Sequence, residues 1–152
     1  MLKAAVRKAS AYPFSAIRAN MEQLPFKDNS FDKAVSITAL EFIENGKGAV
    51  DELFRVTRPG GWVVVATLNS LSPWAARRRA KTERGQKHVL EEAFFRSPDE
   101  LLALSPFKGT AKTVVHFQKD DEPELAVKTE ERGLLDALDT GAFVAALWQK
   151  PK

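Results

Sequence analysis

The segment from Arg58 to Thr67 restricts the possible folds of this chain more than any other segment. Pro59 cannot continue a helix, and Gly60-Gly61 supplies a residue that can adopt positive φ just beyond a helix end. Residues 62–67 (WVVVAT) follow at once and are apolar throughout rather than alternating. Such a run suits a strand that is covered on both faces, as in a parallel sheet. The segment therefore predicts a helix, an abrupt stop and a buried strand.

The rest of the chain carries further helix and strand signals. We expect helices over 2–11, 46–57, 71–87, 97–104 and 130–138, an acidic loop over 119–124, and strands over 15–19, 32–38, 110–117 and 142–149. Ser97, Pro98 and Glu100 form a particularly clear helix start, with a capping serine and a reciprocal glutamate. Strands that alternate with helices predict an α/β fold with βαβ units and a mostly parallel sheet.

Composition narrows the function classes. The 152 residues fit a single domain over 1–152, and no apolar run approaches the roughly 20 residues that cross a bilayer. The chain has no cysteine, and its two histidines, His88 and His116, are far apart, so we expect no metal site. A net charge of +3 is too small to indicate nucleic acid as a partner.

The first twenty residues are basic and contain no acid, which is also typical of an organellar transit peptide. The competing interpretation is an amphipathic helix over 2–11, with Leu2, Val6 and Ala9 on one face. We favour the helix. No apolar region typical of a secretory signal is present, and we expect a cytoplasmic protein.

Two blocks carry a resemblance to a known family. They are Leu24-Pro25-Phe26-Lys27-Asp28-Asn29-Ser30-Phe31-Asp32 and Arg58-Pro59-Gly60-Gly61-Trp62. In this order, with one amphipathic helix between them, they resemble the middle of a class I S-adenosylmethionine (SAM)-dependent methyltransferase of the ubiquinone/menaquinone-biosynthesis type. The resemblance implies a partial Rossmann-like fold, with helices on both faces of a mostly parallel sheet and an antiparallel strand at its C-terminal edge. It also implies SAM as the cofactor.

The resemblance assigns cofactor contacts to residues that follow the strands. Asn20-Met21 stands where the family usually has Asp-Ala, a pair that contacts the adenine amine and ring, and Thr38 closes the next strand. The Asn20 carbonyl oxygen can accept from an amine. An ordinary turn residue is the alternative for Asn20. In open α/β sheets, ligands bind beyond the carboxyl ends of the strands, where these residues are expected.

Further positions are candidates for the acceptor pocket. They are Glu41, Phe42, Asn69, Ser70, Arg77 and Arg78. Phe42 takes the place of a histidine that is common in the family, so no catalytic residue is assigned. In the family the basic segment around Arg77 and Arg78 covers the acceptor, which predicts an acidic acceptor, a headgroup, a membrane surface or nucleic acid. A solvated helix face is the alternative for this segment, and loop polarity is the alternative for Asn69 and Ser70.

The glycine-rich loop that holds SAM in the family does not occur in this sequence. Gly60-Gly61 precedes a strand rather than opening a helix, so it cannot cradle the cofactor. We therefore expect a SAM-dependent methyltransferase, truncated at its N-terminal side, that acts on a small-molecule or lipid-like acceptor and is inactive as this isolated chain. The alternatives are a non-catalytic binding or regulatory remnant and one half of a two-chain assembly.

The same resemblance places the absent strands between residues 15–19 and 32–38, which leaves 32–38 as a sheet edge. An unpaired apolar edge invites pairing with another strand. We expect residues 15–19 to pair directly with 32–38, since about a dozen residues can close a parallel crossover. A homodimer through the exposed edge is the alternative.

Overall fold

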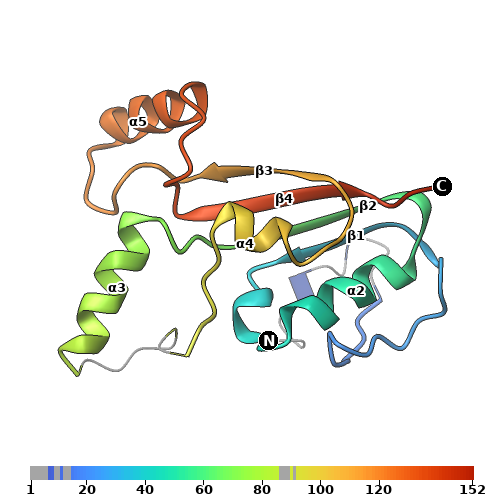
Figure 1. Cartoon of the computed structure of the whole chain (residues 1–152). Helices are drawn as coiled ribbons and strands as arrows, with labels where there is room; N and C mark the ends of the chain where they lie inside the picture. The colour runs from blue at the N-terminus through green and yellow to red at the C-terminus, as the bar shows by residue number, and fades with distance from the viewer. Residues whose placement is uncertain (1–6, 9–10, 12–14, 86–89, 91) are drawn as a thin grey trace.

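The computed structural model describes residues 7–8, 11, 15–85, 90 and 92–152. Its elements, in chain order, are β1 (Phe31–Ile37), η1 (Leu40–Phe42), α2 (Gly46–Val56), β2 (Thr57–Leu68), α3 (Pro73–Glu83), α4 (Pro98–Leu102), β3 (Gly109–Val114), α5 (Pro123–Leu135) and β4 (Phe143–Gln149). Figure 1 shows α2 and α4 against one face of a single sheet, with α3 and α5 toward the end where β2 finishes.

Most of the predicted elements are confirmed, because their start and stop signals are local. The Asn45 side chain caps α2 by accepting the Gly48 N–H at 3.0 Å, and the helix ends before Pro59 as expected. Ser97 and Glu100 form the predicted capping box at the start of α4. α5 begins at Pro123, inside the predicted acidic loop, because proline is well suited to the first turn of a helix.

The block at residues 24–28, which carries part of the family resemblance, is fixed by one arginine of α2. Arg55 donates to the carbonyl oxygens of Leu24 and Phe26 at 3.0 and 2.8 Å. It also pairs with Asp28 at 2.7 Å and with Glu52 at 2.6 Å. Glu52 in turn accepts the Leu24 N–H at 2.7 Å. The turn is therefore a structural clamp that positions the entry to β1.

The sheet order is β1-β2-β4-β3. β1 and β2 are parallel, whereas β2 with β4 and β3 with β4 are antiparallel. The prediction of a mostly parallel sheet is therefore wrong for this chain. The C-terminal strand β4 is antiparallel as predicted, but it lies inside the sheet, and β3 forms that edge. The physical reason is that β4 returns along β2 and pairs on both of its sides.

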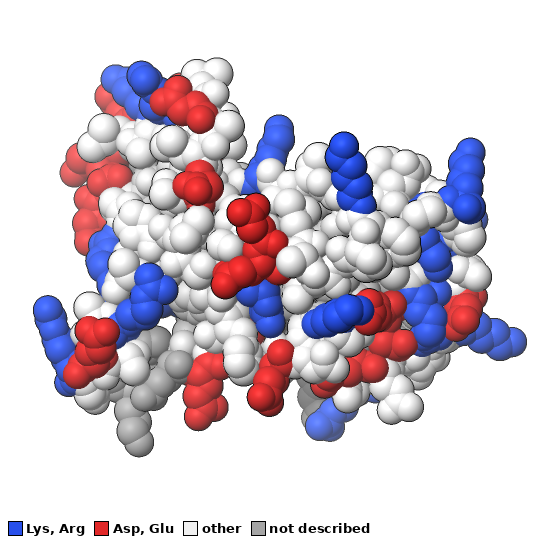
Figure 2. Space-filling view, viewed as in Figure 1, with Lys and Arg blue, Asp and Glu red and all other residues white. Residues whose placement is uncertain are grey.

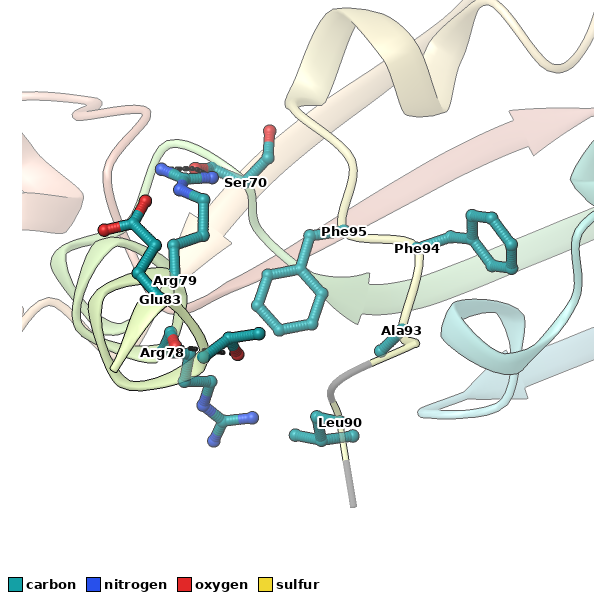
Figure 3. A pocket seen from close by; sticks show the side chains of 9 residues that line it. Ser70, Arg78, Arg79, Glu83, Leu90, Ala93, Phe94 and Phe95 are labelled. Carbon is teal, nitrogen blue, oxygen red and sulfur yellow. Dashed lines mark hydrogen bonds between the residues drawn. The ribbon is translucent and has the colours of Figure 1, made fainter. Parts of the chain in front are cut away.

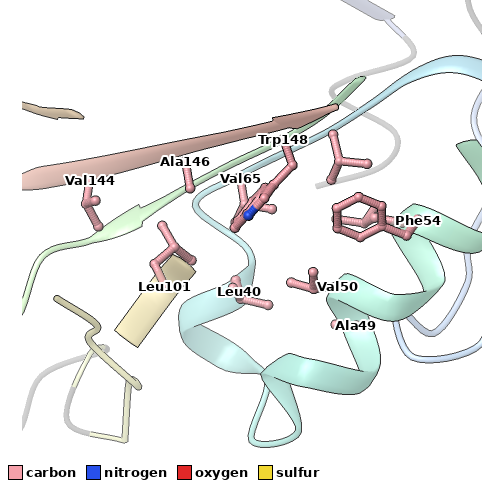
Figure 4. Packing of buried hydrophobic residues seen from close by; sticks show 11 residues of the cluster. Leu40, Ala49, Val50, Phe54, Val65, Leu101, Val144, Ala146 and Trp148 are labelled. Atoms are coloured by element: carbon pink, nitrogen blue, oxygen red, sulfur yellow. The ribbon is translucent and has the colours of Figure 1, made fainter. Parts of the chain in front are cut away.

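The core lies on one face of the sheet (Figure 4). Its members are Leu40, Ala49, Val50, Leu53, Phe54, Val63, Val65, Leu101, Val144, Ala146 and Trp148. Trp148 is 1% exposed and meets the ring of Phe54 edge-on at a centroid distance of 6.1 Å. Each fully buried large side chain stabilises the fold by about 1.5–3 kcal/mol. This packing of α2, α4 and η1 onto the sheet holds the strand ends in place.

The opposite face of the sheet is open over its middle. Val35 and Ile37 of β1 are 57% and 64% exposed, and Trp62 and Leu147 are 38% and 39% exposed. Along β2 and β4, buried residues alternate with residues that are half-buried or exposed. The prediction that residues 62–67 are covered on both faces is therefore wrong for the described residues, although α3 lines a cavity with Leu68 and Phe143 at the far end of this face. The apolar composition is present, but no described element lies over it.

β1 is an edge strand. Residues 15–19 form no strand, and the one bridge near them joins Asn20 to Gln23. The expected pairing of 15–19 with 32–38 is therefore wrong, and within the described residues β1 is paired only with β2. Residues 15–19 lead instead into the turn at residues 24–28, which Arg55 holds against α2 rather than beside β1. The predicted helix over 2–11 lies mostly outside the described residues.

Candidate functional site

The carboxyl ends of β1 and β2 are tied together. Thr38 follows β1 with a left-handed φ of 49°, and its N–H donates to the Ala66 carbonyl at 2.9 Å. Left-handed backbone is uncommon for a β-branched residue and indicates a locally constrained turn. The turn directs the chain from β1 into η1. It thereby sets where Glu41 and Phe42 lie.

Glu41 is a buried tie rather than a free carboxylate. It is 2% exposed, and its Oε2 accepts the Thr67 hydroxyl at 3.0 Å. Its carbonyl oxygen accepts the Phe94 N–H at 2.8 Å. Phe42 next to it is 54% exposed, and its ring cannot act as a general base at the strand ends. Glu41 thus joins η1 to β2 and to the segment that leads into α4.

Arg96 is the main brace of this region, and the sequence prediction missed it. It is 9% exposed and donates to the carbonyls of Leu40 and Phe94 at 3.1 Å and of Ile43 at 3.2 Å. Burial lowers the pKa of the Arg96 guanidinium, while Glu100 and Glu41 act in the opposite direction. Gly46 leaves room for it, because an added Cβ would lie 2.6 Å from Nη2. The only sequence signal is an arginine directly before a helix cap.

Asn69 is the corresponding brace at the end of β2. It is fully buried, and its Nδ2 donates to the carbonyls of Asp139 and Gly141 at 2.6 and 2.7 Å. Its Oδ1 accepts the Leu71 N–H at 3.1 Å. Both ends of the amide are therefore occupied by backbone. Asn69 positions the loop that precedes β4.

Two adjoining cavities lie between α3, the end of β2 and residues 93–95. The outer cavity has a volume of about 480 Å³ and is lined by Ser70, Arg79, Thr82 and Glu83 together with Phe94 (Figure 3). The inner cavity has a volume of about 250 Å³ and is mostly apolar. Its walls include Leu68, Asn69, Trp74, Val115 and Phe143. Arg78 and Phe95 belong to the walls of both, so they stand where the two cavities meet.

The basic helix α3 presents its arginines in three different ways. Arg77 lies over the Trp74 ring, with its guanidinium carbon 5.5 Å from the centroid, and does not line either cavity. Arg79 turns toward the Ser70 carbonyl at 3.4 Å, whereas Arg78 points to the opposite side of the cavity (Figure 3). On the face of the molecule seen in Figure 2, basic and acidic side chains are interspersed. The arginines of α3 therefore make separate local contacts and do not form one continuous basic surface.

The residues that the resemblance assigns to SAM lie elsewhere. The Asn20 Oδ1 accepts the Glu22 N–H at 3.1 Å in an exposed turn, and Met21 packs against the core cluster. Asn20, Met21 and Thr38 line neither of the two cavities. An added Cβ at Gly61 would lie 2.6 Å from the Asp32 carbonyl, so this glycine serves close strand packing. Within the described residues, Asn20, Met21, Thr38 and the Gly60-Gly61 pair therefore form no common cradle for SAM.

Metal chemistry finds no support in the described part of the chain. It contains no group of three or more His, Asp or Glu side chains that could hold an ion. His116 packs against Gly133, and its Nε2 lies 3.3 Å from the Thr113 carbonyl. His88 lies outside the described residues. None of the described helices is long and apolar enough to cross a membrane.

The sequence was compared with known families and proteins. The profile of the family described as "Methyltransferase domain" matches residues 1–65. A demethylmenaquinone methyltransferase of Streptomyces griseus is 37% identical over 135 residues, which are 88% of this chain and 54% of that protein. The chain belongs to the class I SAM-dependent methyltransferase family. A second demethylmenaquinone methyltransferase, of Streptomyces avermitilis, is 35% identical over 113 residues, 73% of this chain and 45% of that protein.

The fold agrees with this family. The structure of a SAM-dependent methyltransferase of Thermotoga maritima, a possible histamine N-methyltransferase, matches with a TM-score of 0.73 and 20% identity. The match covers 95% of this chain and 68% of that one. The methyltransferase chain described here spans about half the length of the two Streptomyces relatives. Its resemblance to that family is confirmed, and the sheet described above is part of that fold.

Proposed function

We propose that this methyltransferase chain supplies the acceptor-binding part of an enzyme that transfers the methyl group of SAM to a small molecule. The observation that carries the proposal is the pair of adjoining cavities at the carboxyl end of β2. Ligands of open α/β sheets bind at this end of the strands. The walls come from separate segments, and Arg96 and Asn69 hold those segments together.

For methyl transfer, the main task of the protein is to position the acceptor beside the methyl group of SAM. Methyl transfer from a sulfonium requires the acceptor atom in line with the methyl group, in a site from which water is excluded. The apolar inner cavity suits that requirement. A nucleophilic acceptor needs no general base, which is consistent with an exposed Phe42 in place of a histidine. The acceptor is therefore selected by the shape and charge of the cavities.

We also propose that the isolated chain binds SAM weakly or not at all, and is inactive alone. The support is that Gly60 and Gly61 both lie within β2, and that Gly46 and Gly48, which open α2, already have Arg96 and the capping Asn45 side chain against them. Isothermal titration of the purified chain with SAM measures this. A dissociation constant near 1 µM, about −8 kcal/mol, would contradict the proposal.

The activity itself is tested by complementation. The part of the Streptomyces griseus relative that this chain does not span would be joined to residues 15–152, and the product assayed with SAM and demethylmenaquinone analogues. We expect SAM binding and methyl transfer in the chimera and neither in the isolated chain. The matched control is the same chimera with its glycine-rich loop replaced by serines. A chimera that binds SAM but methylates no acceptor would favour a non-catalytic binding domain.

A further inference from the structure

The inner cavity has nearly all of its polar groups already satisfied. The Asn69 amide bonds the backbone at both ends, as described above. The Ser72 hydroxyl donates to the Asn69 carbonyl at 2.8 Å and accepts the Ala75 N–H at 3.1 Å. The Trp74 Nε1 donates to the Phe117 carbonyl at 3.1 Å. These groups line the cavity, but their hydrogen bonds are already made within the protein, so they do not need a ligand as a partner.

Arg78 is the exception. Its Nη1 is buried and has no hydrogen-bond partner. The guanidinium carbon lies over the Phe95 ring, 5.9 Å from its centroid, and this contact supplies no hydrogen-bond acceptor for Nη1. A buried donor without an acceptor costs stability, and a charged one costs more. An anionic ligand group at this point would remove that cost.

The surroundings favour an anion over a neutral acceptor. Arg77 and Arg79 flank Arg78 in the sequence, and Lys81 and Arg84 follow, whereas Glu83 is the one acid of the segment from Arg77 to Arg84. Guanidinium groups bind carboxylates and phosphates through paired N–H donors. The remaining wall is apolar and aromatic, through Trp74, Phe95 and Phe143. An apolar body would fill it.

We propose that the inner cavity binds a small, largely apolar molecule that carries one anionic group, and that Arg78 binds that group where the two cavities meet. The assignment of this molecule as the methyl acceptor rests on the proposed function, whereas the binding itself does not. The volume of about 250 Å³ lies below the 300–1,000 Å³ of most ligand pockets, so the body is one ring or a short chain.

The test uses two probes of the same shape, cinnamate and cinnamamide, titrated into the 152-residue chain without SAM and followed by ¹H–¹⁵N NMR. We expect cinnamate to bind at least tenfold more tightly than the neutral amide. In Arg78→Gln that preference should vanish, and in Arg78→Lys it should fall only in part. Lys81→Gln removes the same charge from the same helix outside the cavities and should keep the full preference.

Two results would overturn the proposal. One is equal affinity of the wild-type chain for both probes, which includes the absence of binding. The other is a preference that survives in folded Arg78→Gln, judged by its dispersed NMR spectrum. If Arg78→Gln does not fold, Arg78→Lys still decides, because a preference that falls no further in Arg78→Lys than in Lys81→Gln would contradict the proposal. Because SAM is absent from every arm, the outcome is independent of methyl transfer.

Discussion

Single side chains join the segments that follow the strands of this methyltransferase chain, and Arg96 joins η1 to the segment before α4. One guanidinium bonds carbonyl oxygens of Leu40, Ile43 and Phe94, which come from two separate segments. Methionine at position 96 would fill much of the same space but leave those carbonyls without donors. We expect Arg96→Met to lower the free energy of unfolding by about 2–4 kcal/mol in urea titrations.

Arg79 offers the matched control for this substitution, because it is exposed and its bonds to the Ser70 carbonyl are long, at 3.4 Å. Arg79→Met should change the free energy of unfolding by less than about 0.5 kcal/mol. Similar losses in the two variants would show that Arg96 is not a brace.

The clamp between α2 and the turn at residues 24–28 makes stability depend on pH. The hydrogen bond from Arg55 is the main cause that lowers the pKa of Glu52 below its ordinary value of 4.5. A folded-state pKa below the unfolded one stabilises the fold above pH 4.5, and that contribution is lost as the pH falls through the lowered value. We expect the urea midpoint of the wild-type chain to drop as the pH falls below the ordinary value of 4.5.

In Glu52→Gln this part of the acid dependence should be absent, so the two proteins should converge in stability toward low pH. Asp51, which pairs with Lys47 on the exposed side of α2, provides the comparison. Asp51→Asn should retain nearly the full acid dependence. Parallel curves for the wild type and Glu52→Gln would exclude the clamp as its source.

Elements with local signals could be predicted from the sequence, and their neighbours in the sheet could not. Asn45 and Ser97 cap helices within three residues of themselves, so the starts of α2 and α4 could be predicted from the sequence. The position of β4 between β2 and β3 depends on contacts between residues about 30–90 positions apart. No local pattern states which strand neighbours which.

The candidate site shows the same limit. Asn69 and Ser70 were predicted from their place after β2, and Arg78 from the basic segment that covers the acceptor in the family; all three line the cavities. Phe95 and Arg96 were missed, because their role arises from a segment that returns to the strand ends from almost 30 residues away. The assignment of Asn20, Met21 and Thr38 to the cofactor stays a prediction.

The unpaired edge of β1 predicts association between two copies of the chain. Thr38 donates its N–H to β2, so by the alternation of the strand the N–H groups of Val35 and Ile37 point to the open side. We expect the chain to form a dimer through this edge at high concentration. Sedimentation velocity should show Val35→Pro as a monomer, since proline removes one outward donor and leaves the β1–β2 ladder intact.

Val35→Thr keeps both the branched shape and the N–H group, and it should still dimerise. If Val35→Pro and the wild type sediment alike at every concentration, edge pairing is not the mode of association.

Among the described residues, the sheet has two unlike faces: one that α2 and α4 cover, and an apolar one that meets water. That second face contributes nothing to the core, yet its residues stand in regular rows across the strands, such as Val35, Val64 and Leu147. Association at this face rather than at the β1 edge would be insensitive to proline at position 35. The two modes are therefore separable.

The open face also leaves a thermal signature. Unfolding raises the heat capacity because it brings apolar surface into water, by about 12–15 cal/mol/K per residue, or roughly 2 kcal/mol/K for a domain of 152 residues. Here part of that surface is hydrated before unfolding begins. Calorimetry of the monomer should give a heat-capacity increment clearly below this range, and a stability curve flatter than that of an ordinary domain of equal length. An increment within the range would mean that the face is covered in solution.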